Sequence, residues 1–433
     1  MRIAIIGSGI SGIAAATELH PEHEITMFEA ADRIGGHAHT VDVELPDGRV
    51  AVDTGFIVFN EDNYPGFTGL LSSHGVTSQP TEMSFSVAQA HGVEYRGSNP
   101  SSVFAQRRNL VNPRHWRMIA DLVRFNRATA RLVADEAPWL GPDRLPGPGA
   151  VDTQSIAEFL NEGRYSADFV ERFLIPFGSA IWSAEPQTFT QFPIQSYARF
   201  MSNHGLLGVS GRKQWRTVSG GSREYLTRVT APFADRIHTR TPVLSIGETA
   251  GIPVVRTAHG EALFDEVILA THSDTALSLL ERPTEQEAAT LRQLRYYPNI
   301  ATLHSDSSVM PRTRRAWASW NYHVGSAASG ASVTYWMNLL QQLSTDTQLF
   351  VTLNRSDEID PGAVLGEWVY HHPVFDTDAL AAQRRRHEIQ GTRHRWYAGA
   401  YWGYGFHEDG TQSGFEVARG LQSLQPVAEV VAA

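Results

Sequence analysis

The sequence predicts an α/β protein in two parts: a discontinuous domain built on a parallel sheet, and an inserted α+β domain with an antiparallel sheet. A short apolar strand, a glycine loop and a small-residue helix open the chain at residues 2–19, and glycine-rich α/β segments return from about residue 218 and about residue 394. The 433 residues also exceed what one core usually holds, so about two or three packed units are expected.

The first elements form a βαβ unit. Residues 2–7 are apolar and end at glycine, as in a short buried strand, residues 10–19 form a helix of small residues, and residues 24–29 form a second strand. Because both strands look apolar on both faces, we expect them to be parallel and central in their sheet.

The loop after the first strand reads Gly7-Ser8-Gly9-Ile10-Ser11-Gly12. In a G-x-G-x-x-G loop the first glycine allows a tight turn, the second lets backbone approach a diphosphate, and the third lets helix and strand pack closely. Glu29 ends the second strand, 20 residues after Gly9, where a carboxylate accepts hydrogen bonds from ribose hydroxyls and repels a 2′-phosphate. The pattern predicts a Rossmann-type dinucleotide site for FAD or NAD, with the diphosphate at the helix N-terminus.

The remaining elements follow from periodicity and turn signals. Helices are predicted at residues 64–75, 155–173, 222–233, 284–294 and 413–424, and an arginine-rich helical segment at 110–137. Strands are predicted at residues 41–52 (a hairpin around Pro46-Asp47-Gly48), 236–247, 252–257, 263–270, 299–304, 331–338, 348–354 and 394–401. The strands between 299 and 354 are expected to share one antiparallel sheet, and residues 141–149 to form a loop.

Composition excludes several classes of protein. A net charge of −10 argues against nucleic-acid binding, and the basic run at residues 384–387 is interpreted as a solvated helix face. The absence of cysteine excludes disulfides, iron–sulfur clusters and thiol catalysis. No signal peptide is visible and no apolar stretch approaches the length of a transmembrane helix, so a cytoplasmic protein is expected.

Two further regions favour FAD over NAD. Residues 35–40 read Gly-Gly-His-Ala-His-Thr, and residues 397–401, 407–410 and 413–418 form a glycine-rich closing segment. These motifs resemble the FAD-dependent amine oxidase superfamily, which includes monoamine oxidases, phytoene desaturases and protoporphyrinogen oxidase. There the first motif reads G-G-R-x-x-T, so His37 replaces the usual arginine.

The resemblance implies non-covalent FAD and assigns residues to it. The implied contacts are Gly7, Gly9, Ser11, Gly12, Glu29, Ala30, Arg33, Gly35, Gly36, His37, Thr54, Gly55, Phe56, Val243, Ala270, Glu408, Gly414 and Phe415. Together with the order of the elements, it predicts an FAD-binding domain at residues 1–75, 205–280 and 392–428, and a substrate domain at 76–204 and 281–391.

Within the superfamily, the chain is most similar to the predicted NAD/FAD-binding flavoproteins associated with cyclopropane fatty acid synthase. Residues 53–60, 317–322 and 403–410 carry this match, and the association suggests an acyl-chain substrate.

Candidate acid–base groups are histidines, since imidazole titrates near neutral pH. We select His407, in the closing segment, and His304, at a strand end. The lysine that the superfamily often holds near the flavin has no clear match, and Lys213 is the one weak candidate. No His, Asp or Glu spacing indicates a metal site.

Three functions remain open. The first is an FAD-dependent oxidoreductase that removes a hydride from a C–H bond of a small-molecule or acyl-chain substrate. The second is a redox-neutral flavoenzyme, such as an isomerase or dehydratase. The third is a flavin-binding partner of a lipid-modifying enzyme. The sequence leaves the electron acceptor and the oligomeric state unknown.

Overall fold

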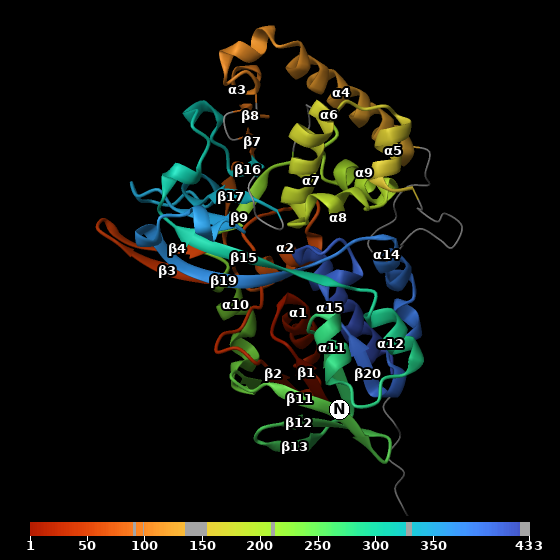
Figure 1. Ribbon diagram of the computed structural model, residues 1–433. Helices are drawn as coiled ribbons and strands as arrows, with labels where there is room; N and C mark the ends of the chain where they lie inside the picture. The colour runs from red at the N-terminus through yellow and green to blue at the C-terminus, as the bar shows by residue number, and fades with distance from the viewer. Residues whose placement is uncertain (90–91, 98, 135–153, 209–212, 326–330, 425–433) are drawn as a thin grey trace, which may run out of the picture. The chain divides into compact units, whose positions relative to one another are not determined.

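The computed structural model describes residues 1–433 except 90–91, 98, 135–153, 209–212, 326–330 and 425–433 (Figure 1). The predicted loop at 141–149 lies outside the described residues. The chain divides into two compact units: unit 1 is Met1–Gly36, Leu226–Leu294 and Ala381–Ala433, and unit 2 is His37–Tyr225 and Arg295–Leu380.

Both units are discontinuous, but their bounds differ from the predicted domain bounds. Residues 37–75 and 205–225 fall in unit 2, and residues 281–294 and 381–391 fall in unit 1. Strand pairing explains the first difference, because β5 (Phe59–Asn60) and β6 (Ser78–Thr81) both pair with β9 (Trp215–Val218) in one small sheet. The segments around these strands therefore belong to one unit.

Unit 1 is built on a five-stranded parallel sheet, which confirms the predicted α/β class (Figure 1). Its strands, in order across the sheet, are β10 (Ile237–His238), β2 (Glu24–Phe28), β1 (Arg2–Ile6), β14 (Glu266–Leu269) and β20 (Arg395–Tyr397). The long strand predicted at 236–247 is wrong: β10 ends at His238, Arg240 adopts a positive φ of 52°, and Pro242 follows.

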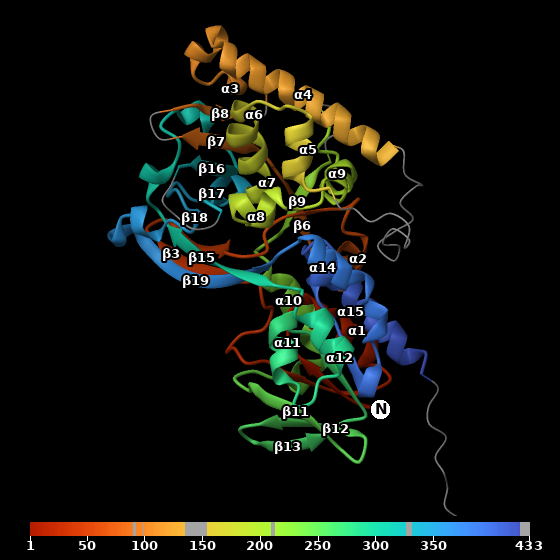
Figure 2. The same cartoon turned by 45° about the vertical axis from the view of Figure 1, so that its right-hand side comes forward.

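Helices and a small antiparallel sheet complete unit 1. The helices are α1 (Ile10–Leu19), α11 (Ser273–Leu279), α12 (Glu285–Leu291) and α15 (His407–Gln422), and the sheet contains β11 (Val243–Thr249), β12 (Ile252–Thr257) and β13 (Gly260–Leu263). Two helices, α10 (Arg223–Thr230) and α14 (Thr377–Arg384), cross the unit bounds. Figures 1 and 2 both show α1 beside α15. The last helix begins six residues before the predicted start at 413, because Asp409 accepts a hydrogen bond from the Phe406 N–H and caps it.

Unit 2 contains the predicted antiparallel sheet. The order of its seven strands is β19 (Val364–Pro373), β15 (Tyr296–His304), β18 (Phe350–Leu353), β17 (Val333–Trp336), β16 (Trp320–Val324), β7 (Phe85–Gln89) and β8 (Glu94–Arg96). Only the β16–β7 pair is parallel among these described strands. The predicted hairpin is present as β3 (Thr40–Leu45) and β4 (Gly48–Asp53).

Unit 2 also contains helices, most of which lie together in Figure 2. They are α2 (Pro65–Ser73), α3 (Pro100–Val103), α4 (Pro113–Ala134), α5 (Ile156–Glu162), α6 (Ala167–Phe169), α7 (Ile175–Trp182), α8 (Pro186–Thr190), α9 (Ile194–Asn203) and α13 (Met337–Leu340). The single helix predicted at 155–173 is wrong, because α5 ends at Glu162 with Gly163 as its C-cap, Arg164 has a positive φ of 50°, and Ser166 is the N-cap of α6. Across the described residues, none of the helices has the length and apolar character needed to cross a bilayer.

Candidate dinucleotide site

The glycine loop of unit 1 requires two of its glycines for steric reasons. Gly7 has a φ of +103°, and a Cβ added there would lie 2.7 Å from the Ala270 carbonyl oxygen. A Cβ on Gly12 would lie 2.1 Å from the carbonyl oxygen of Gly7. Both positions therefore serve the close packing of α1 against the end of β1 and β14, as the motif predicts.

Gly9 differs from these two glycines. Its φ of −68° and ψ of 175° suit any residue, and a Cβ added there would meet nothing within 4 Å. Gly9 is also the N-cap of α1, and neither a side-chain cap nor an acidic residue occupies the first turn of that helix. The space above Gly9 and the N–H groups of the first turn thus suit an anionic ligand.

Glu29 lies at the end of β2, beside the loop. Its carboxylate accepts hydrogen bonds from the Ser8 N–H (3.0 Å), the Ser8 hydroxyl (2.6 Å) and the Ala31 N–H (2.9 Å). The Glu29 backbone is bonded on both sides to the segment that leads into β11: its N–H donates to His238, and its carbonyl accepts from Thr241. Glu29 therefore holds the loop in place and brings the start of β11, with Val243, to the same sheet end.

The Gly35-Gly36 pair approaches the same loop. The Gly35 N–H donates to the Ser8 carbonyl at 2.9 Å, and a Cβ on Gly36, whose φ is +57°, would lie 3.3 Å from the Gly9 Cα. The Ala270 N–H donates to the Ile6 carbonyl, which fixes Ala270 beside Gly7. The structure thus gathers Gly7, Gly9, Ser11, Gly12, Glu29, Gly35, Gly36 and Ala270 around one loop, with Ala30 and Arg33 on the connecting turn.

The closing helix packs directly on α1. A Cβ added to Gly414 would lie 2.3 Å from the Ser11 carbonyl oxygen, and a Cβ added to Gly410 would lie 2.8 Å from the Ile10 Cγ2. Gly414 therefore supports α1 by close packing, and its flavin contact stays a prediction. Gly410 was not selected from the sequence, although a G-x-x-x-G spacing signals close helix contact.

The first turn of α15 carries buried titratable groups. Burial lowers the pKa of His407 to about 3 and raises the pKa of Asp409 to about 7. Glu408 accepts a hydrogen bond from Gln412 at 2.7 Å, and Phe415 is half-buried one turn further along. Asp409 was also missed by the sequence analysis, because only its burial distinguishes it from an ordinary helix-capping carboxylate.

Four of the predicted flavin contacts belong to unit 2: His37, Thr54, Gly55 and Phe56. A Cβ on Gly55 would lie 2.0 Å from the His37 carbonyl oxygen, which accepts from the Phe56 N–H at 2.8 Å. The His37 Nε2 lies 3.0 Å from the His371 carbonyl oxygen, and the Thr54 hydroxyl lies 2.7 Å from the Tyr370 hydroxyl. Both side chains are therefore tied to β19, a strand that the sequence analysis did not predict.

Asp53 of unit 2 is a buried carboxylate that the site prediction omitted. It accepts hydrogen bonds from the Thr40 hydroxyl (2.6 Å), the Ser222 N–H (2.9 Å) and hydroxyl (2.8 Å), and the Gln341 amide (2.9 Å). Burial nevertheless raises the pKa of Asp53 to about 6. Gly221 precedes Ser222 with a φ of +93°, so the turn that leads into α10 also wraps this carboxylate.

His304 lies inside the seven-stranded sheet of unit 2. Its Nδ1 accepts from the Asp306 N–H at 3.2 Å, so its Nε2 carries the proton and donates to the Thr352 hydroxyl at 2.7 Å. Burial lowers the pKa of His304 to about 4. Both nitrogens of this fully buried ring are thus used within the fold.

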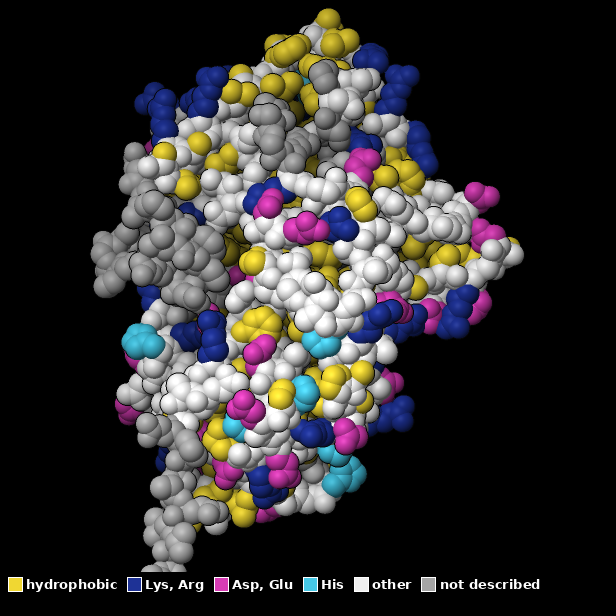
Figure 3. Space-filling view, turned by 180° about the vertical axis from the view of Figure 1, so that it is seen from behind, with side chains coloured by type: hydrophobic (Ala, Val, Ile, Leu, Met, Phe, Trp, Pro, Cys, Tyr) yellow, Lys and Arg dark blue, Asp and Glu magenta, His cyan; other side chains and the backbone are white. Residues whose placement is uncertain are grey.

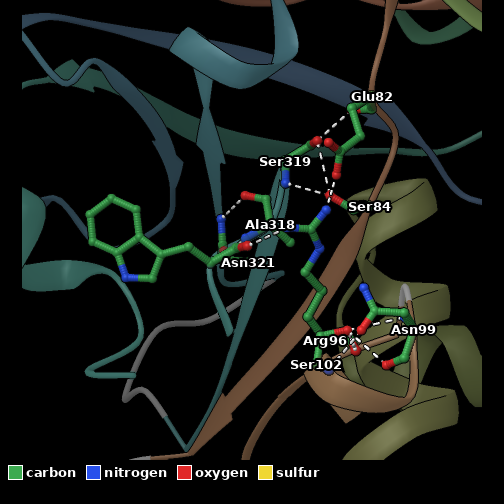
Figure 4. A network of polar contacts seen from close by, with 9 residues as sticks. Glu82, Ser84, Arg96, Asn99, Ser102, Ala318, Ser319 and Asn321 are labelled. Atoms are coloured by element: carbon green, nitrogen blue, oxygen red, sulfur yellow. Dashed lines mark hydrogen bonds and ion pairs between the residues drawn. The ribbon is translucent and has the colours of Figure 1, made fainter. Parts of the chain in front are cut away.

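The segment at 317–322 is held by a buried polar network (Figure 4). The Asn321 amide donates to the carbonyls of Ala318 (2.7 Å) and Thr334 (3.0 Å), and its oxygen accepts from the Ser86 hydroxyl (2.8 Å). Ser319 donates its N–H to the Ser84 hydroxyl at 3.0 Å and its hydroxyl to the Glu82 carbonyl. These contacts fix the β16–β7 edge, which gives this motif a structural explanation.

Two other candidates are also located. Lys213, the single lysine of the chain, lies 3.8 Å from the Asp62 carboxylate. Over the part of the chain that the structure describes, no group of three or more His, Asp or Glu side chains has a geometry that could hold a metal ion.

The fold and the loop together define a dinucleotide-binding protein of Rossmann type. Comparison with known families identifies the particular family: residues 10–305 match the flavin containing amine oxidoreductases, and the chain belongs to this family. Its members use FAD. The open space at Gly9, the uncapped N-terminus of α1 and the Glu29 carboxylate beside the loop fit that cofactor.

Individual relatives agree with this family. The chain is 24% identical to bovine amine oxidase B over 264 residues, which cover 60% of this chain and 48% of the bovine one. It spans about half the length of the curated relatives it matches.

Two solved structures share the fold. Cyclohexylamine oxidase of Brevibacterium oxydans has a TM-score of 0.69 at 17% identity, covering 97% of this chain and 99% of that one. The fatty acid isomerase of P. acnes that produces CLA has a TM-score of 0.70 at 17% identity, covering 96% and 98%.

Proposed function

We propose that this chain is an FAD-dependent oxidoreductase that removes a hydride from a C–H bond of an apolar organic substrate. The observation that carries the proposal is the loop geometry of unit 1: Gly12 is sterically enforced, whereas Gly9 leaves open space at an uncapped helix N-terminus. Bound FAD would supply the hydride acceptor. In this proposal the glycine loop of unit 1 binds the cofactor.

The chain's own residues would bind and orient the cofactor. The first-turn N–H groups of α1 would hold the diphosphate, and Glu29 would accept hydrogen bonds from the adenosine ribose while it keeps Ser8 in place. Gly410 and Gly414 would act indirectly, because they let α15 support α1 at short range. The remaining predicted contacts, including His37, Thr54, Gly55 and Phe56, stay proposals of the same kind.

The histidines selected from the sequence are poor proton carriers at neutral pH. Burial lowers the pKa of His407 to about 3 and that of His304 to about 4, so both rings are neutral at pH 7. We therefore assign them structural roles. Asp409, whose pKa burial raises to about 7, is the group of the closing segment that can hold or release a proton near neutral pH.

An acyl chain is the favoured substrate class over an amine. The resemblance to flavoproteins associated with cyclopropane fatty acid synthase supports it. The chain's single lysine pairs with Asp62, which argues against the lysine-assisted oxygen chemistry of amine oxidases. A second candidate is a redox-neutral fatty acid isomerase, which the fold shared with the P. acnes enzyme supports.

The test is anaerobic addition of candidate substrates to the purified holoprotein, followed by absorbance of the flavin and mass spectrometry of the organic products. Bleaching by a long-chain acyl substrate with formation of a new double bond supports the oxidoreductase. Double-bond movement without net bleaching supports the isomerase instead. A flavin that responds to neither acyl chains nor amines, in a protein that binds a lipid-modifying enzyme, would replace both with the partner function.

A further inference from the structure

A long helix of unit 2 exposes positive charge and apolar side chains together. We propose that α4 and the preceding turn at Arg107–Val111 bind the surface of an anionic phospholipid bilayer. Two groups of exposed side chains define the surface. The arginine face is Arg107, Arg108, Arg114, Arg117, Arg124, Arg127 and Arg131, and the apolar tip is Leu110, Val111 and Trp116. This inference does not depend on the proposed activity.

The sequence of α4 separates an inward face from an outward one. The inward side chains are buried and recur at helical spacing: His115, Met118, Asp121, Phe125 and Thr129. On the opposite side, Arg117, Arg124 and Arg131 recur every seven residues, with Arg127 between them, and all are exposed. The inward face explains why the helix folds onto α6 and α9. Arg124 also serves the fold, because it donates to the Gly163 carbonyl and lies over the Tyr165 ring, whereas no described contact of this kind explains Arg117, Arg127 and Arg131.

Charge along α4 and the preceding turn is almost entirely positive. The only acidic residue between 101 and 134 is Asp121, which is buried, lies 2.9 Å from Arg124 and accepts from the Ser166 N–H. Arg114 pairs with Asp168 at 2.8 Å. Arg107, Arg117, Arg127 and Arg131 have no carboxylate partner among the described residues. This local excess contrasts with a chain whose net charge is −10.

The side chains of the apolar tip are exposed, although a hydrogen bond holds the backbone of the turn in place. Leu110 is 47%, Val111 85% and Trp116 50% exposed. The Trp116 indole N–H donates to the Leu110 carbonyl at 2.9 Å, and the buried Asn109 anchors the turn below it. Trp116 also contacts Phe104, with ring centroids 5.1 Å apart. Figure 3 shows hydrophobic side chains at the end of the molecule where α3 and α4 lie, with Lys and Arg side chains beside them.

This combination fits a bilayer better than the other anionic or apolar partners. Arginine binds lipid phosphates in a bidentate manner, and exposed Trp, Leu and Val enter the zone between headgroups and acyl chains. A nucleic acid would use the arginines and leave Leu110 and Val111 in water. A second copy of the chain would place arginine against arginine.

Each basic residue near an anionic membrane strengthens binding roughly fivefold. The four arginines without carboxylate partners would then contribute together a factor of several hundred, enough for reversible association without an anchor.

The test is sedimentation of the flavin-loaded protein with phosphatidylcholine vesicles, with and without phosphatidylglycerol. We expect binding only to vesicles that contain phosphatidylglycerol, and weaker binding as salt rises. Arg117→Glu/Arg127→Glu should lower this binding at least about twentyfold. The matched control Arg282→Glu/Arg292→Glu changes charge equally on exposed sites of unit 1 and should bind as the wild type does.

A second pair of variants tests the apolar tip. Val111→Asp should reduce vesicle binding several-fold, whereas Leu263→Asp, at an apolar side chain 46% exposed in unit 1, should not. All four variants should keep the wild-type flavin content and Tm, since the changed side chains are exposed. Equal binding to both vesicle types, no binding, or equal binding by the arginine variants would overturn the proposal. So would tight binding of duplex DNA that Val111→Asp leaves intact, or a dimer in sedimentation velocity that Arg117→Glu/Arg127→Glu disperses.

Discussion

A pair of alanine substitutions in the glycine loop separates the cofactor role of this loop from its folding role. At Gly9 the backbone suits alanine and an added Cβ meets nothing within 4 Å, so Gly9→Ala should fold normally. The same methyl group would occupy the space proposed for the diphosphate. At Gly12 an added Cβ would lie 2.1 Å from the Gly7 carbonyl oxygen, so Gly12→Ala must push α1 away from β1.

The expected changes in FAD affinity and in Tm follow from these distances. Displacing the diphosphate would cost about two charge-assisted hydrogen bonds at about 1.5 kcal/mol each, which weakens FAD binding roughly a hundredfold for Gly9→Ala. The Tm of its FAD-free form should stay within about 1 °C of the wild type. Gly12→Ala should cost about 3 kcal/mol by overpacking and lower the Tm of the FAD-free protein by about 5 °C or more.

FAD titration followed by flavin fluorescence, and thermal unfolding of the FAD-free proteins, measure the two effects. Wild-type FAD affinity in Gly9→Ala would refute the diphosphate site at this loop. A normal Tm in Gly12→Ala would refute the steric explanation of the third glycine.

Three further predictions concern other positions. Glu29→Ala should weaken FAD binding about tenfold or more, because it removes a ribose acceptor and releases Ser8, and unchanged affinity would reject the contact. Gly414→Ala should lower the Tm, since its Cβ would lie 2.3 Å from the Ser11 carbonyl oxygen, whereas Gly69→Ala, with nothing within 4 Å, should not. Burial raises the pKa of Asp53 from 3.8 to about 6, so the folded state favours the protonated carboxyl and the wild type loses about 3 kcal/mol as pH rises from about 4 to 6. The Asp53→Asn variant should not lose stability over this pH range. Parallel curves of Tm against pH for the variant and the wild type would contradict the raised pKa of Asp53.

The strongest sequence patterns predicted their structures correctly. The strand, glycine loop and helix at residues 2–19, the hairpin at residues 41–52 and the antiparallel sheet containing residues 299–304 all rest on local signals of two kinds: turn residues and hydrophobic period. The prediction missed secondary-structure elements where those local signals were weak. The strand β19, for example, exposes Leu365 and Val369 and buries Tyr370, so apolar and polar residues do not alternate along it in the pattern that marks a half-buried strand.

The sequence by itself determined which residues can form the loop, because backbone conformation and helix start signals are local properties. Tertiary structure decided what surrounds each side chain, and burial and partners set its chemistry. It placed His304 and His407 where imidazole stays neutral, gave Asp53 four donors in a buried site, and set Gly414 against α1. No spacing along the chain reports those neighbours, because they come from segments far apart in sequence that only folding brings into contact.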